Sequence, residues 1–120
     1  MNQALIRFSL VVCAGLSLAC GGGEDPKPLV DCTMVTVPKY SALGATLPKC
    51  TACHSSALTG AARMMAPVGA NFDTYDAAKA RAVVAASRVS FGQMPPPGAT
   101  PLTDAEKTAL INWGSCGAPM

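Results

Sequence analysis

Cys50-Thr51-Ala52-Cys53-His54 is the segment of this 120-residue chain whose residue types and spacing point most directly to chemistry. Two thiols three residues apart can add to two vinyl groups on one edge of a porphyrin, and the adjacent imidazole can then bind the iron. His54 is the only histidine of the chain, so it cannot be joined by a second histidine ligand from the same chain. The motif predicts one covalent haem c, attached at Cys50 and Cys53 and bound through His54.

A CxxC pair is less specific without the histidine, because it also occurs in zinc sites and redox-active disulfides. A zinc site would need two further ligands, and besides the expected lipid site Cys20 only the isolated Cys32 and Cys116 remain after the signal peptide. A thioredoxin-like dithiol would need a preceding strand in a βαβ context, which the pattern lacks. Haem attachment is therefore favoured, with zinc binding and thiol–disulfide exchange as the alternatives.

Met94 is the methionine best placed to be the second axial ligand. It stands in Gly92-Gln93-Met94-Pro95-Pro96-Pro97-Gly98, after an intervening predicted helix. The prolines restrict the backbone and the glycines permit close approach, so such a loop could hold a thioether toward iron. Met64 and Met65 follow His54 too closely to reach the opposite face easily. The alternative for Met94 is simple core filling under a Pro-rich loop.

The N-terminus is typical of an exported protein. Residues 1–19 combine Arg7 with a short apolar run that is too short to span a bilayer, as in a signal peptide. Leu16-Ser17-Leu18-Ala19-Cys20 resembles a bacterial lipobox, except that Ser17 replaces a branched apolar residue. Cys20 is therefore the expected lipid attachment site, and plain secretion with a free Cys20 is the alternative.

Residues 20–36, rich in Gly, Pro and charge, are expected to be a flexible lipid-anchored tether, and residues 37–118 a single domain. Nine Lys and Arg residues face seven Asp and Glu residues, without a basic cluster, so nucleic-acid binding has no support. Aromatic residues make up only 5% of the chain. A domain with so few large side chains buries a modest core, so a staple or a large cofactor would help it fold.

Three main helices are predicted in the domain. Residues 38–49 should form a short one, because Tyr40, Leu43 and Leu47 recur at helical spacing and Pro48 can close it. Residues 50–72 show no clear period and should form loops and turns.

The second helix should begin after a cap at Asp73 or Thr74, and its apolar face is Tyr75, Ala78, Ala82, Ala85, Ala86 and Val89. Residues 91–100 contain three consecutive prolines and should form a rigid extended loop. Thr103-Asp104-Ala105-Glu106 is a capping box that should start the third helix, and Gly114 should end it. The expected fold class is all-α.

The order of His54 and Met94, the Gly-x-Met-Pro-Pro loop and the closing helix from Leu102 to Trp113 are similar to a mono-haem class I cytochrome c domain. The similarity runs over residues 38–118. It implies a small α-helical shell around one haem, in which the first and last helices pack across each other. By position, Cys50 and Cys53 would form the thioethers, His54 the proximal bond and Met94 the distal bond. Tyr40 and Leu43 would face Leu110 and Trp113 at the helix crossing.

Cys32 and Cys116 then lie just outside the first and last helices. In an oxidising compartment they are expected to form a disulfide, which would stabilise the fold by roughly 4 kcal/mol, and two free thiols are the alternative. The haem propionates would need cationic partners. Arg63, Lys79, Arg81 and Arg88 are the candidates, although each could equally be solvated surface, and none is singled out.

The expected function is electron transfer outside the cytoplasm by an iron with His/Met ligation, rather than catalysis. Both axial positions would be filled, and a thioether ligand raises the reduction potential. The expected partners are redox proteins and, through the lipid anchor, a membrane on the periplasmic side. The alternative is a five-coordinate haem sensor or peroxidase-like enzyme, against which the lack of a distal acid or base beside Met94 counts.

Overall fold

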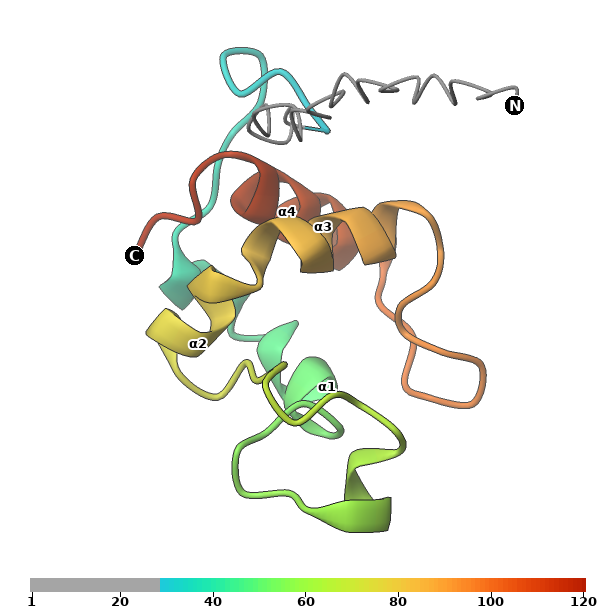
Figure 1. Cartoon of the computed structure of the whole chain (residues 1–120). Coiled ribbons are helices and arrows are strands. Elements are labelled where there is room, and N and C mark those ends of the chain that lie inside the picture. Colours follow the sequence, from blue (N-terminus) through green and yellow to red (C-terminus); the bar gives the residue numbers. More distant parts are fainter. Residues whose placement is uncertain (1–28) are drawn as a thin grey trace, which may run out of the picture.

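The computed structural model describes residues 29–120 (Figure 1). The regular elements in this part of the chain are all helices, and none is a strand. The elements in chain order are η1 (Tyr40–Leu43), α1 (Leu47–Thr51), η2 (Gly60–Arg63), α2 (Tyr75–Ala80), α3 (Ala82–Ser90) and α4 (Asp104–Ser115). The all-α class is thus confirmed for this part of the chain. The predicted signal peptide, residues 1–19, and Cys20 lie outside the described residues. Between residues 29 and 120, no helix is both long and apolar enough to cross a membrane.

Helix α4 begins as the sequence predicts. The Thr103 side chain accepts a hydrogen bond from the backbone N–H of Glu106 at 3.2 Å, and the Glu106 carboxylate accepts one from the backbone N–H of Thr103 at 2.7 Å. Two backbone donors that the first helical turn leaves free are thereby satisfied. The predicted capping box is confirmed.

The predicted end of α4 at Gly114 is wrong, because the helix continues to Ser115 and Gly114 is buried inside it. A Cβ atom at Gly114 would lie 2.3 Å from the Ala82 carbonyl oxygen and 2.9 Å from the Ala86 Cβ. Glycine therefore allows the backbones of α3 and α4 to approach closely, and these two helices form the main helix pair (Figure 1). Gly114 serves packing rather than termination.

The predicted second helix is divided in two. Thr74, one of the two expected caps, accepts a hydrogen bond from the N–H of Ala77 at 3.3 Å. Arg81, with φ −115° and ψ 4°, then separates α2 from α3. Ala78 and Ala82 stay buried on either side of this break, so the predicted apolar face survives it.

The predicted helix over residues 38–49 is wrong. Only the short η1 forms there, and α1 begins at Leu47 with Pro48 in its first turn. Proline is tolerated at that position because the first N–H groups of a helix have no helical partner anyway. Pro48 therefore opens a helix instead of closing one. Helix α4 packs mainly against α3 and makes a smaller contact with η1.

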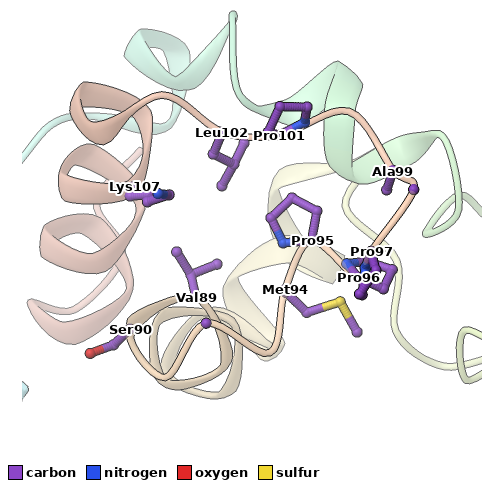
Figure 2. Close-up of a pocket in the computed structure, with 12 residues that line it drawn as sticks. Val89, Ser90, Met94, Pro95, Pro96, Pro97, Ala99, Pro101, Leu102 and Lys107 are labelled. Atoms are coloured by element: carbon purple, nitrogen blue, oxygen red, sulfur yellow. The ribbon is translucent and has the colours of Figure 1, made fainter.

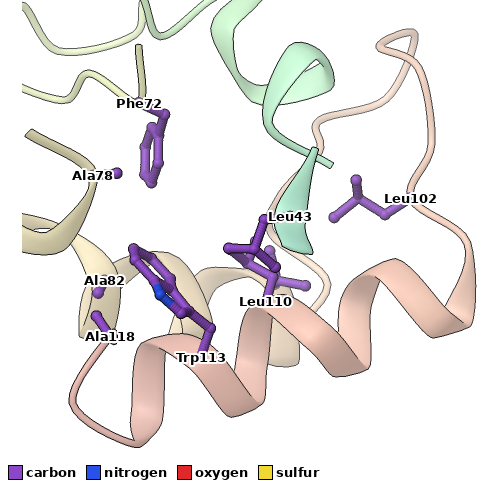
Figure 3. Packing of buried hydrophobic residues seen from close by; sticks show 9 residues of the cluster. Leu43, Phe72, Ala78, Ala82, Leu102, Leu110, Trp113 and Ala118 are labelled. Atoms are coloured by element: carbon purple, nitrogen blue, oxygen red, sulfur yellow. The ribbon is translucent and has the colours of Figure 1, made fainter. Parts of the chain in front are cut away.

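The core lies between η1, α3 and α4, where Leu43, Leu110 and Trp113 are fully buried. Figure 3 shows Leu43 against Leu110, with the Trp113 ring extending toward Ala82. Leu43 and Tyr40 of η1 thus lie beside the two α4 residues that the family resemblance implied, with 5.9 Å between the ring centroids of Tyr40 and Trp113. Trp113 Nε1 donates to the carbonyl oxygen of Pro119 at 2.9 Å, which ties the chain end to the core.

A disulfide joins Cys32 to Cys116, with their Cα atoms 5.6 Å apart. Next to it, the Asn112 side chain donates to the carbonyl oxygen of Thr36 at 3.2 Å. These two links fasten the last residues of the expected tether, from Cys32 onward, along α4.

Candidate haem site

The two motif cysteines lie at the end of α1 and in the turn that follows it. The backbone N–H groups of Cys53 and His54 both donate to the carbonyl oxygen of Cys50, at 3.2 and 2.9 Å. Both thiols are free and half-buried. Cys50 packs against the core, and burial, with a smaller contribution from the Glu106 carboxylate, raises the pKa of its thiol to about 11.

His54 is fixed on two sides. Its Nδ1 atom lies 3.0 Å from the carbonyl oxygen of Ala70, and its ring meets the ring of buried Phe72 edge-on, with 5.6 Å between centroids. The Phe72 N–H also donates to the His54 carbonyl oxygen at 2.9 Å. When Nδ1 donates its proton to a backbone carbonyl, Nε2 keeps the lone pair that a metal ligand requires. The arrangement suits an axial imidazole.

Met94 sits in the Pro-rich loop that links α3 to α4. Its backbone N–H donates to the carbonyl oxygen of Arg88 at 3.2 Å, and its half-buried side chain packs against the core. The loop borders a pocket of about 570 Å³ that is open to solvent (Figure 2), lined mainly by apolar side chains that include Val89, Met94 and Leu102, with Lys107 of α4 also on the wall. As predicted, residues 91–100 form a loop without a helix or a strand.

The flanking glycines of this loop adopt a backbone conformation that favours glycine, although no other part of the described chain approaches either of them closely. Gly92 and Gly98 have φ values of 65° and 89°, which place both in the left-handed region that favours glycine. They let the chain turn sharply on either side of Met94. The Met94–Pro95 peptide bond is cis.

The structure brings the predicted site residues to one core cluster from different directions. Cys50 and Met94 both pack against it, and His54 contacts it through Phe72. None of the hydrogen bonds or ring contacts of His54 in the described part of the chain involves Met94. In Figure 1, α1, which carries Cys50, lies below α3 and α4 in the view.

The donor set fits a haem better than a bare metal ion. Among residues 29–120, no three His, Cys, Asp or Glu side chains gather into a group that could hold a metal ion. Two free thiols, one oriented imidazole and one thioether are present instead. This set suits an iron porphyrin, because the ring nitrogens supply the other four ligands and the thiols anchor the ring edge.

The candidate propionate partners occupy different environments. Arg81 and Arg88 are exposed, and they donate to the carbonyl of Gly69 at 3.1 Å and to the Gln93 side chain at 2.6 Å. Lys79 lies 5.4 Å from the centre of the Tyr75 ring. Arg63 differs from these three, because it is buried beside the His54 loop. One feature of the sequence could have distinguished Arg63 from the other three candidates: it is the sole charged residue between Lys49 and Asp73.

No family model, curated protein or solved structure matches this chain. The similarity to class I cytochrome c domains therefore rests on the motif residues of the sequence alone.

Proposed function

We propose that this protein is an electron carrier with one c-type haem, attached to Cys50 and Cys53 and ligated by His54 and Met94. The observation that carries the proposal is the fixed imidazole of His54, whose Nδ1 is occupied by the Ala70 carbonyl at 3.0 Å directly after the two free thiols. When bound, a haem would supply an iron that alternates between Fe(III) and Fe(II).

The residues around the site would hold that iron in one geometry. Phe72 and the Ala70 carbonyl restrict rotation of the His54 ring, and the backbone bond to Arg88 restricts Met94. If His54 and Met94 both bound the iron, no ligand position would remain for a substrate, and their restricted side chains would reduce the rearrangement that each electron transfer requires. These features favour an electron carrier over an enzyme.

The buried thiol of Cys50 counts against a thiol–disulfide exchange module. Exchange requires a thiolate, and reactive cysteines of CxxC motifs have a lowered pKa. Burial instead raises the pKa of Cys50 to about 11, so this thiol stays protonated at neutral pH. Such a thiol is better suited to permanent attachment by a dedicated pathway than to repeated exchange.

We also propose that the protein works on the periplasmic side of a membrane, anchored by a lipid at Cys20. The Cys32–Cys116 disulfide supports export, since structural disulfides persist in oxidising compartments. Because Cys32 is fastened to α4, the tether available to the haem domain would be residues 20–31. Membrane-associated redox proteins would be its partners.

The decisive experiment uses the full chain, exported from a host with a haem-attachment pathway. We expect a haem stain on a denaturing gel and, in the oxidised protein, a low-spin spectrum with an iron–thioether charge-transfer band. Met94→Ala should abolish the band. Met64→Ala is the matched control, because Met64 is exposed and its Sδ lies only 3.6 Å from the Cys53 Sγ.

Each outcome has a distinct meaning. An unstained gel would reject the haem and leave thiol exchange or zinc binding. A band lost in Met64→Ala but kept in Met94→Ala would show that the wrong methionine had been assigned. Rapid binding of carbon monoxide by the resting reduced protein would favour the five-coordinate sensor or enzyme.

A further inference from the structure

Arg63 is the one buried cation of the described chain, with only 4% of its surface exposed. It lies at the end of η2, inside the loop that follows the haem motif. Its guanidinium donates to six acceptors, five of them backbone carbonyls. They are the carbonyl oxygens of Ser55, Leu58, Ala66, Pro67 and Ala70, and the side-chain oxygen of Asn71.

No carboxylate of the described chain forms an ion pair with Arg63, although, after the Ser56 hydrogen bond, the guanidinium contributes as the smallest of several causes to the lowered pKa of Asp73. The ion pairs formed within residues 29–120 are Lys49–Glu106 and Lys107–Asp104, and neither includes Arg63. A guanidinium stays protonated in proteins, so the loop encloses a permanent positive charge that is hydrogen-bonded to five backbone carbonyls and the Asn71 side chain. Charges act over longer distances in such an environment than at the water-exposed surface.

The carbonyl oxygen of Ala70 links this charge to His54. It lies 3.0 Å from His54 Nδ1 and accepts a hydrogen bond from Arg63 Nη2 at 3.2 Å. A carbonyl has two lone pairs, so it can accept both. The guanidinium draws electron density from that oxygen, which makes it a weaker acceptor for the imidazole proton. Hydrogen bonds to the outer nitrogen of a ligating histidine set its basicity.

We propose that Arg63 is a positioning residue that holds the Ala70 carbonyl against His54 and raises the reduction potential of the haem. This inference rests on the proposed function. Two effects act in the same direction. The buried positive charge disfavours the additional positive charge of Fe(III), and the weakened bond to Ala70 makes His54 a poorer electron donor, which also favours Fe(II).

Three variants of the exported holoprotein test the proposal by spectroelectrochemical titration. Arg63→Met removes the charge and the hydrogen bonds while keeping most of the side-chain volume. Arg63→Lys keeps the charge but loses the planar fork. Arg81→Met is the matched control, because Arg81 also binds a carbonyl of this loop, that of Gly69 at 3.1 Å, but from an exposed position.

Arg63→Met should favour Fe(III) at least tenfold relative to the wild type, which corresponds to a potential lowered by about 59 mV. Arg63→Lys should give a smaller decrease. Arg81→Met should change the equilibrium less than twofold, because an exposed charge is screened by water and salt. A shift in Arg63→Met no larger than that in Arg81→Met would overturn the proposal.

A measurement on the wild-type protein keeps the test independent of whether the variants fold. In the nuclear magnetic resonance spectrum of the reduced protein, the Arg63 guanidinium protons should exchange slowly with water. They should also show a nuclear Overhauser effect to the His54 Nδ1 proton. Rapid exchange without that effect would reject the Arg63–Ala70–His54 link. An unstained gel would instead reject the proposed function itself, so the two failures are distinguishable.

Discussion

The two halves of the domain are held together by different forces. In the helical half, residues 75–118, apolar contacts dominate, and Leu110 and Trp113 are almost completely shielded from water. In the motif half, residues 47–72, Arg63 and Phe72 are the only buried residues. One half is a packed core closed by a disulfide, whereas the other is a loop wrapped around a single guanidinium.

The motif half buries little apolar surface of its own. Met64 and Met65 are exposed there and have φ values of 48° and 67°, a region that disfavours residues with side chains. A loop with little apolar burial gains little from the hydrophobic effect. The proposed haem would supply the missing apolar surface on the side where Cys50 and His54 meet the core. The helical half should therefore govern global stability, and the motif half should govern the properties of the site.

Removal of the disulfide should have the largest effect on stability. The bond closes a loop with a sequence separation of 84 residues. In the chain-entropy model, the double variant Cys32→Ser/Cys116→Ser should lose about 4 kcal/mol of unfolding free energy. Urea denaturation followed by circular dichroism measures this, with Met34→Ala as a control in the same N-terminal segment. A loss below about 1 kcal/mol would show that the packed core suffices without the bond.

Overpacking at the crossing of α3 and α4 should have the next largest effect. Gly114→Ala places a Cβ 2.3 Å from the Ala82 carbonyl oxygen, so one helix backbone must move. We expect a loss of about 1–3 kcal/mol of unfolding free energy in the same denaturation experiment.

Gly44→Ala is the matched control for this substitution. Gly44 is exposed and helical in conformation, and its nearest neighbour would be 3.7 Å from the new Cβ. This variant should retain or slightly increase stability. Equal losses in both variants would mean that the α3–α4 crossing is not a tight contact.

The features that were predicted correctly from the sequence depend on residues close to one another in the chain. The capping box at Thr103 follows from residue types three positions apart, and the helical face with Ala78 and Ala82 follows from periodicity. The end of α4 and the first helix were predicted wrongly, because glycine and proline each have two common uses. Only the tertiary neighbours of Gly114, on α3, decide between termination and close packing.

The candidate site was similarly divided between local and long-range information. The motif itself identifies Cys50, Cys53 and His54. The partners of His54 could not be predicted, because Ala70 contributes a backbone carbonyl, which any residue carries. The burial of Arg63 depends on how the loop closes around it, and no periodic pattern in residues 50–72 indicates that closure.

The smallest predicted effect concerns the link between the two halves. Ser56, in the motif half, donates to the Asp73 carboxylate through its hydroxyl and through its backbone N–H at 3.2 Å. The Ser56 hydroxyl is the main cause of a lowered pKa for Asp73. A carboxylate whose pKa is lower in the folded state stabilises the fold above its ordinary pKa and loses that contribution as the pH falls. The link should therefore weaken from about pH 5 downward.

Asp73→Asn should flatten part of this pH dependence and cost less stability at neutral pH than either substitution above, because the pair is exposed to water. Ser56→Ala should cost a similar amount, and the double variant should cost less than the sum if the two side chains interact. The free energy of unfolding of the wild type, the two single variants and the double variant is measured at pH 7 and at pH 3. Some pH dependence should remain in all four proteins, because the hydrogen bond with Lys49 also lowers the pKa of Glu106. Strict additivity would show that the Ser56 and Asp73 side chains contribute independently. A measurable coupling that disappears at pH 3 would show that the ionised Asp73 carboxylate holds the Ser56 segment, beside the Lys49–Glu106 ion pair that also joins the two halves.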